Sequence, residues 1–149
     1  MTHETDATRI WFRLLRLQTR INLAITERVR TLGLSVPQCD VLTTLTEREG
    51  ISQQELAERL YVTKGNISGL IDRLETAKLV ERRATENDKR SYAIFLTPQG
   101  RALAEQGIDV QRSFVLDSLG RMDAQDLAKF ETLIVQVRDL VRERQSKAD

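Results

Sequence analysis

The amino-acid sequence predicts a mainly α-helical protein that carries one small β-hairpin. The chain is rich in Leu, Arg, Glu and Ala, which favour helices, whereas Pro occurs only twice and Gly seven times in 149 residues. Apolar residues recur at helical spacing along most of the chain, and the spacing changes to two only after Leu79. With 40% hydrophobic and 30% charged residues, the chain is long enough for one globular domain.

Several classes of protein are not expected. The start MTHETDATRI lacks the basic and apolar regions of a signal peptide, and no stretch approaches the roughly 18 apolar residues of a membrane span, so we expect a soluble cytoplasmic protein. Cys39 is the only cysteine and His3 the only histidine, so we expect no internal disulfide, no metal site and no other cofactor. No catalytic residue is predicted, because phosphate-binding loops are missing and the carboxylates alternate with Lys and Arg, as on solvated helix faces.

The first predicted element is a long amphipathic helix over residues 8–32, where apolar residues follow the i, i+3, i+4, i+7 pattern. Gly33 ends this helix. A second helix begins at Ser35, where Gln38 completes a capping box, and it ends before Gly50.

Two short helices follow, joined by a tight turn. Ser52 and Glu55 form another capping box at the start of the first, and a turn over residues 61–63 separates it from a helix over residues 63–75. Two short helices joined in this way form a helix-turn-helix unit, whose second helix enters the major groove of DNA. The sequence therefore predicts a nucleic-acid-binding element here.

The second of these helices carries Gly65 and Gly69 one turn apart, although each costs about 1 kcal/mol relative to Ala in a helix interior. An apolar stripe assigns the opposite face to packing: Ile67, Leu70, Ile71 and Leu74. A small polar face lets a helix sink deep into a groove, where Asn66 and Ser68 can hydrogen-bond base edges. The alternative is that the glycines relieve crowding against another helix. The residues assigned to DNA on this helix are Thr63, Lys64, Gly65, Asn66, Ser68, Gly69 and Arg73.

A change of period predicts a β-hairpin. Residues 79–84 (LVERRA) and 91–96 (SYAIFL) alternate with a period of two, and the polar segment TENDKR lies between them. Val80 and Arg82 fall on one face of the first strand. A charged tip alone is more often a solvated loop, but beside a recognition helix it predicts a wing that reaches a phosphate track or the minor groove. The wing residues assigned to DNA are Arg82, Arg83, Lys89 and Arg90.

The run DRLETAKLVERRATENDKRSYAIFLTPQG, Asp72 to Gly100, resembles the signature of the MarR family of bacterial winged helix-turn-helix regulators. The close resemblance covers residues 35–100, and the helix layout extends it over nearly the whole chain. The resemblance implies a homodimer that binds an inverted repeat in double-stranded DNA and represses or activates nearby genes, with repression as the expected role. It also implies release by a small molecule or an oxidant.

The resemblance maps the family's recognition helix onto residues 63–75 and its wing-tip pair onto Asp88 and Arg90. Asp88 is expected to orient Arg90 through an ion pair and not to touch DNA itself. The chain departs from the family at Lys78, where glycine is common before the first wing strand. A lysine there must adopt a less favourable backbone conformation or end the helix differently, which affects the angle of the wing.

Two further helices are predicted after the hairpin. One begins at Thr97-Pro98, and Asp123 caps the other, whose apolar residues approach heptad spacing. We interpret the first and last helices as a bundle shared by two subunits, with packing inside one chain as the alternative. The predicted domains are a helical dimerisation region at 1–34 and 98–149 and a winged helix-turn-helix DNA-binding domain at 35–97.

The net charge of +1 does not by itself favour DNA, because neutralised phosphates provide most non-specific affinity. DNA binding therefore requires that cations gather on the recognition helix and the wing. The alternative function is a helical adaptor that grips a protein partner with its winged domain. A basic stripe along helix and wing would distinguish the two, and an enzyme is the third and least expected class.

The resemblance also implies an effector site where the dimer helices meet the winged domain. Trp11, Arg16 and Cys39 are the candidates to line it, although a tryptophan is more often a core residue. Cys39 lies near a helix start, where the dipole favours a reactive thiolate. It also shares a stripe with Leu42, and free cysteines commonly pack as small buried hydrophobes, so we expect packing to outweigh redox sensing.

Overall fold

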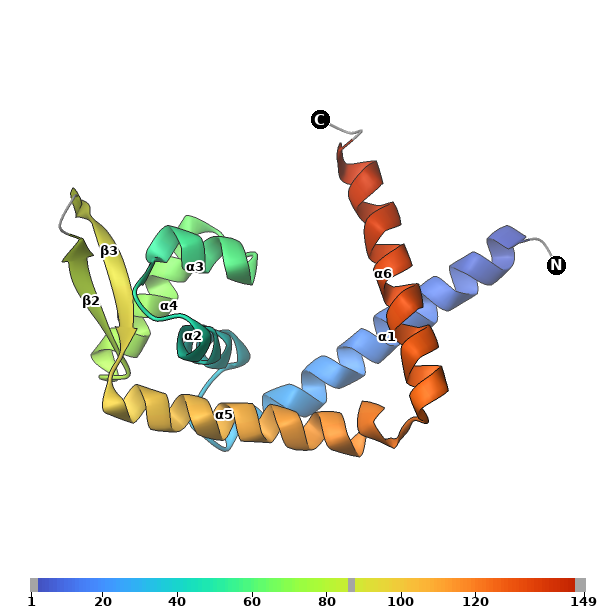
Figure 1. Ribbon diagram of the computed structural model, residues 1–149, viewed down its shortest axis with the longest axis horizontal. Helices are drawn as coiled ribbons and strands as arrows, with labels where there is room; N and C mark the ends of the chain where they lie inside the picture. The colour runs from blue at the N-terminus through green and yellow to red at the C-terminus, as the bar shows by residue number, and fades with distance from the viewer. Residues whose placement is uncertain (1–2, 86–87, 147–149) are drawn as a thin grey trace. The chain divides into compact units, whose positions relative to one another are not determined.

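The computed structural model describes the backbone of residues 3–85 and 88–146 and the side chains of residues 4–85 and 91–145. These residues form α-helices and a three-stranded antiparallel sheet with strand order β1-β3-β2, so the predicted fold class is confirmed (Figure 1). The elements are α1 (His3–Arg30), α2 (Val36–Glu47), β1 (Ile51–Ser52), α3 (Gln53–Leu60), α4 (Lys64–Thr76), β2 (Val80–Thr85), β3 (Asp88–Leu96), α5 (Pro98–Asp117), a short 3₁₀ helix (Leu119–Arg121) and α6 (Ala124–Ser146).

The chain divides into two compact units, residues 1–111 and 112–149, and the division falls inside α5. The domain boundaries expected from the sequence, at 34/35 and 97/98, divide the chain by function, into a dimerisation region and a DNA-binding domain. The division into compact units does not test them, so they stay a prediction. Among the described residues, no helix combines the length and the apolar character that a membrane crossing needs.

The starts of α2 and α3 follow from their caps. The Gln38 backbone N–H donates to the Ser35 hydroxyl (3.3 Å), and the Ser35 N–H donates to the Gln38 side chain (2.9 Å), which completes the predicted capping box. At α3 the Ser52 hydroxyl accepts from the Glu55 N–H (3.0 Å), but the Glu55 carboxylate pairs with Arg59 at 3.1 Å. The second capping box is therefore only half formed, because an arginine one turn later attracts the carboxylate.

The core of the first unit lies among α2, α3, α4 and the sheet. Its fully buried large side chains come from all of these elements and from the C-terminal part of α1, and they include Val29, Leu42, Leu45, Leu56, Ile71, Leu74 and Ile94. The predicted inward stripe of α4 is buried along its whole length. Each such side chain contributes about 1.5–3 kcal/mol when it leaves water, so this core fixes α4 against α2 and α3.

The wing consists of longer strands than the sequence indicated. β2 and β3 pair from Val80 and Leu96 outward to Thr85 and Asp88, with an irregularity between Ala84 and Thr85. The expectation that TENDKR forms a polar tip between the strands is wrong in extent, because Thr85 belongs to β2 and residues 88–90 to β3. The third strand, β1, was not predicted, since two residues are too few to show a period.

Lys78 adopts the left-handed backbone conformation that its position suggested, with φ of 60°. The Lys78 N–H donates to the Glu75 carbonyl and the Leu79 N–H to the Leu74 carbonyl, both at 2.9 Å. This pair of bonds is the Schellman arrangement that usually ends with glycine. The lysine therefore takes the strained conformation and keeps the helix end, so β2 starts directly after α4 (Figure 1).

The start of α5 is attached to the same junction. The Thr97 hydroxyl donates to the Lys78 carbonyl (2.7 Å) and accepts from the Gly100 N–H (3.0 Å), while the Thr97 N–H donates to the Leu79 carbonyl (3.1 Å). A Cβ on Gly100 would overlap the Leu79 carbonyl, so this position has no room for a side chain. The end of the wing and the start of α5 are thereby held to the end of α4.

The second unit contains the end of α5, the 3₁₀ helix and α6. Asp123 caps α6 as predicted, because its carboxylate accepts from the Asp126 N–H at 2.9 Å, and this bond lowers the pKa of Asp123. The large apolar residues that α6 exposes are Leu127, Leu133, Ile134, Val135, Val137, Leu140 and Val141. In a single chain this helix presents a broad apolar face to solvent.

Candidate nucleic-acid interface

The N-terminal half of α4 presents a polar and uncrowded face. The Thr63 hydroxyl caps the helix by accepting from the Asn66 N–H at 3.2 Å, and Lys64, Gly65 and Asn66 are exposed. An added Cβ on either Gly65 or Gly69 would meet no described atom within 4 Å. Gly65 and Gly69 therefore relieve no crowding against another helix within the described chain. This result argues against the alternative explanation of the two glycines, as far as packing inside one chain is concerned.

The turn between α3 and α4 carries a residue that sequence reasoning missed. Tyr61 ends α3 in the left-handed conformation, with φ of 54°, and its side chain is 90% exposed. A tyrosine is unfavourable in this conformation, which glycine or asparagine adopts more easily. The sequence did show a large aromatic residue in the turn of the helix-turn-helix unit, which could have drawn attention to this position. Tyr61, two residues before the cap of α4, is therefore an additional candidate for contact with DNA.

A groove runs beside this face between α3, α4 and β3. Its volume is about 340 Å³, and the residues that line it are mostly polar: Ser52, Gln53, Gln54, Lys64, Ile67, Ser91 and Tyr92. The hydroxyl, amide and ammonium groups in this list can donate to phosphate oxygens or to base edges. The first helix of the unit thus contributes polar groups next to the recognition helix.

The wing contributes one described exposed cation. Arg83 is paired with Glu81 at 3.2 Å, with both side chains more than half exposed, and its guanidinium lies 4.1 Å from the centre of the Phe95 ring. Exposed pairs of this kind are weak, so Arg83 can exchange Glu81 for a phosphate at little cost. The predicted wing residues Asp88, Lys89 and Arg90 lie outside the side chains that the structure describes.

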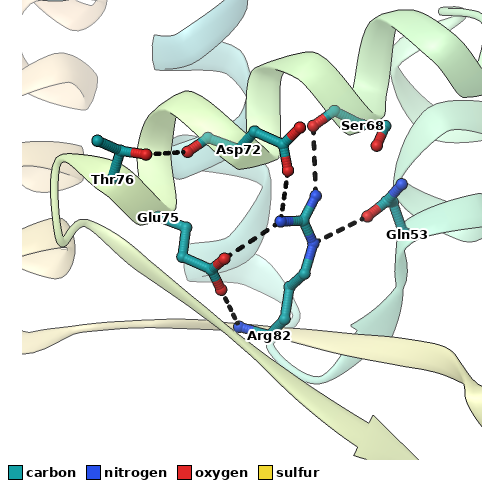
Figure 2. Close-up of polar contacts among 6 residues, drawn as sticks. All are labelled: Gln53, Ser68, Asp72, Glu75, Thr76 and Arg82. Carbon is teal, nitrogen blue, oxygen red and sulfur yellow. Dashed lines mark hydrogen bonds and ion pairs between the residues drawn. The ribbon is translucent and has the colours of Figure 1, made fainter.

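Arg82 occupies a different position from the one its place in the sequence suggested. Figure 2 shows its side chain among residues of α4 and α3. Its Nη1 lies 2.7 Å from Asp72 and 3.2 Å from Glu75, its Nη2 donates to the Ser68 carbonyl (3.3 Å), and its Nε donates to Gln53 (3.3 Å). The Glu75 carboxylate also accepts from the Arg82 backbone N–H at 3.1 Å.

These contacts hold the guanidinium against the helices, and the Arg82 side chain is only 15% exposed. The structure therefore does not favour the predicted direct contact between Arg82 and DNA, because four of the five guanidinium N–H donors already face an acceptor inside the protein. The signal for this placement was present in the strand period, because Arg82 shares a face with Val80, which is buried. The identity of its partners could not be read in that pattern.

The positive charge of the interface is smaller than the arginine count suggests. Asp72 and Glu75 lie on α4 with side chains 64% and 44% exposed, and both pair with Arg82. The predicted cations that stay exposed in the described part of the chain are Lys64, Arg73 and Arg83. Arg82 thus offsets two carboxylates that would otherwise repel a phosphate backbone near the recognition helix.

The three predicted effector residues do not come together within one chain. Trp11 is 52% exposed and Arg16 is exposed, both on α1, whereas Cys39 is fully buried on α2. The end of α1 that joins the core is at Val29, which follows Trp11 by 18 residues, or about 27 Å along a helix. A crevice that includes all three would need a contribution from outside the single chain.

Cys39 packs as a core residue. A Cβ on Gly107 would stand 2.7 Å from its Sγ, so α5 approaches α2 closely at this point, and Gln111 donates a long hydrogen bond to the sulfur at 4.0 Å. Burial and the nearby Asp40 carboxylate raise the pKa of the Cys39 thiol. Both effects reduce the thiolate fraction, so the helix-dipole argument for a reactive cysteine is outweighed.

Comparison with known proteins identifies relatives of one kind. Residues 32–91 match the sequence model of the MarR family. An uncharacterized HTH-type transcriptional regulator of Bacillus cereus is 33% identical over 114 residues, which cover 76% of each chain. The crystal structure of a MarR family transcription regulator matches with a TM-score of 0.85 and 25% identity, over 98% of this chain and 97% of the other. An Escherichia coli MarR mutant complexed with operator DNA shares the fold, with a TM-score of 0.79 at 24% identity, over 92% and 99% of the two chains.

Proposed function

Because this chain belongs to the MarR family of transcriptional regulators, we propose that it is a dimeric repressor that binds an inverted-repeat operator and is released by a small-molecule effector or an oxidant. The observation that carries the proposal is the outward face of α4. It is polar and free of bulk at Gly65 and Gly69, while the opposite face is buried in the core. A helix with these two faces can enter a major groove as far as its backbone allows.

The contacts to DNA divide into two kinds. Asn66 and Ser68 are the candidates for base edges, because their side chains both donate and accept hydrogen bonds. Thr63, Lys64 and Arg73 on the helix, with Arg83, Lys89 and Arg90 on the wing, are the candidates for phosphate or minor-groove contacts. Asp88 stays the proposed orienting partner of Arg90.

The apolar face of α6 supports the dimer. A monomer that exposed this many large apolar side chains on one helix would aggregate or bind a partner, and a second copy satisfies the face symmetrically. We propose that α1 and α6 of two subunits share one bundle. A twofold axis would then place the recognition helices about 34 Å apart, one turn of DNA.

The effector site is proposed at the dimer, with Trp11 and Arg16 as its candidates. The buried position of Cys39 supports a packing role and not a contact with the ligand. The alternative function, an adaptor that grips a protein with its winged domain, is less well supported, because family membership favours DNA and nothing in the described chain selects a protein partner.

The proposal is tested by selection of a binding site. The purified protein is used to select duplexes from a random-sequence DNA library, and Asn66→Ala is compared with the parent on the selected duplex and on a scrambled one. Loss of a base contact should cost about 1–3 kcal/mol on the selected duplex and little on the scrambled one. Gln136→Ala, on α6, is the control.

Two results would contradict the proposal in different ways. If no sequence is enriched by the parent, the adaptor becomes the better function. If a sequence is enriched but Asn66→Ala binds it as the parent does, then the chain binds DNA by another surface.

A further inference from the structure

We propose that Arg82 is a positioning residue, which sets the angle of the wing against the recognition helix, so that operator affinity depends on a contact that does not touch DNA. The inference rests on the proposed DNA-binding function and adds a residue role to it. The group that carries it is the Arg82 cluster, defined as Arg82 with Gln53, Ser68, Asp72 and Glu75 (Figure 2).

The cluster leaves little of Arg82 for direct contact with a phosphate, because four of its five guanidinium N–H donors already face an acceptor and its side chain is only 15% exposed. A guanidinium has five N–H donors, and in this cluster each of its three nitrogens already has an acceptor. The partners come from both helices of the helix-turn-helix unit, since Gln53 lies on α3 while Asp72 and Glu75 lie on α4. One side chain of the wing is therefore bonded to both helices at once.

The cluster lies near the start of β2, so a small change of angle there produces a larger displacement at the far end of the strand. Val80 anchors the start of the strand in the core, and Arg82 pairs with the buried Ile94 on β3. The end of β2 at Thr85 lies three residues beyond Arg82, which is about 10 Å at the usual rise of a strand. A tilt of about 10° at the cluster would move that end by about 2 Å, which is enough to break a hydrogen bond to DNA.

A substitution of Glu75 can distinguish a positioning role of the Arg82 cluster from a purely electrostatic effect on DNA binding. Its carboxylate accepts from the Arg82 backbone N–H and from the guanidinium, so it holds both the strand and the side chain. Removal of a negative charge from the DNA-facing side strengthens binding if only charge matters. If the carboxylate holds the wing in place, the same removal weakens binding. The two roles predict opposite signs.

The experiment compares Glu75→Met with Glu81→Met on a duplex selected from a random library by the parent protein. Methionine keeps the length of the side chain but accepts no strong hydrogen bond, and Glu81 lies on the same wing strand with Arg83 as its ion-pair partner. We expect Glu75→Met to bind about tenfold more weakly, with the salt dependence of the parent, because no phosphate contact is lost. Glu81→Met should bind as tightly as the parent or more tightly.

Arg82→Lys is the second variant and decides the question if Glu75→Met is unfolded by circular dichroism. A lysine keeps the charge, but its single nitrogen cannot reach all four acceptors of the cluster, so positioning predicts a similar loss with an unchanged salt slope. Equal or tighter binding by folded Glu75→Met, or parental affinity of Arg82→Lys, would overturn the inference. A salt slope reduced by about one contact in Arg82→Lys would also overturn it, since Arg82 would then touch a phosphate. A parent that enriches no duplex would instead contradict the proposed function.

Discussion

Single residues in an unfavourable backbone conformation lie at the junctions of the winged domain. Lys78 and Tyr61 are the non-glycine residues with positive φ in the described chain, and each ends a helix of the helix-turn-helix unit. A side chain in the left-handed region costs about 1–2 kcal/mol. The chain accepts this cost at Lys78 because both Schellman hydrogen bonds and the Thr97 contact to its carbonyl form there.

Lys78→Gly should stabilise the fold by about 0.5–1 kcal/mol, because glycine adopts φ of 60° without strain but loses more entropy on folding. The measurement is urea unfolding followed by circular dichroism. Ala77→Gly is the matched control, since Ala77 is in the right-handed region with φ of −76° and should lose stability. A Lys78→Gly protein no more stable than the parent would show that the lysine is not strained.

Cys39 should be unreactive in the folded protein. Burial and Asp40 raise its pKa above the ordinary value of 9.0, so little thiolate forms at neutral pH, and a thiol reagent should modify it only as fast as the chain unfolds. Peroxide should change operator binding of the parent and of Cys39→Ser equally. Sensitivity in the parent alone would restore redox sensing through Cys39.

The same raised pKa fixes the sign of a pH effect. The folded state favours the neutral thiol, so its contribution to the free energy of unfolding is complete at neutral pH and is lost as the pH rises through the raised pKa. As the pH rises above about 8, where an ordinary cysteine begins to ionise, the parent should therefore lose more stability than Cys39→Ala. Parallel losses would mean that the thiol does not titrate differently in the folded state.

At the scale of elements, α4 combines an anchored face with an open one. The buried stripe of Ile67, Leu70, Ile71 and Leu74 holds it in the core, and Arg82 holds the wing to its outer edge. The glycines on the open face weaken the helix without any packing benefit inside the described chain. A loss of stability that brings no contact is typical of a surface shaped for a ligand.

Gly65→Ala and Gly69→Ala should each raise the stability of the fold by up to about 1 kcal/mol, because alanine is the better helix former and the added methyl group meets no neighbour. Both should weaken binding to the selected duplex, because the methyl groups keep the helix from its full depth in the groove. Thermal unfolding and DNA titration on the same samples check both effects. Greater stability with unchanged affinity would place the glycines outside the interface.

At the scale of the whole molecule, the second unit leaves the apolar face of α6 exposed, and the proposed dimer would cover it. α6 exposes Ile134, Val137 and Val141 at 51%, 48% and 47%. The heptad-like spacing expected from the sequence predicted the stripe, and the exposure in a single chain shows that its own unit does not cover it. The identity of the partner that covers this stripe, and the geometry of the contact, come from the proposal that two subunits share one bundle.

Ile134→Glu should convert the dimer into a monomer and abolish binding to the selected duplex, because a carboxylate would be buried in the apolar bundle without a partner. Light scattering after size-exclusion chromatography measures the mass. Gln136→Glu adds the same charge to an exposed residue about 200° away around α6 and should stay dimeric. A dimeric Ile134→Glu would mean that the subunits meet elsewhere.

The sequence by itself determined the helices, most of their caps and the helix-turn-helix unit. These features depend on residues three or four positions apart, such as Ser35 with Gln38 or Asp123 with Asp126, so a local pattern is sufficient to predict them. The wing strands were predicted as elements but not in their full length, because the charged residues near the tip hide the period of two. For Lys78 the family resemblance left two possibilities, a less favourable backbone conformation or a different helix end, and the structure shows the first.

Only the tertiary structure decided which distant residues meet. Arg82 contacts Gln53 across 29 positions, and Glu49 binds both the Leu96 N–H (2.8 Å) and Arg101 (2.6 Å) across about 50 positions. Such contacts have no spacing of their own, because they exist only after the core has placed α3, α4 and the sheet together. For the same reason, the sequence identified Arg82 as a cation of the wing, whereas the fold turned it into the link between the wing and the recognition helix.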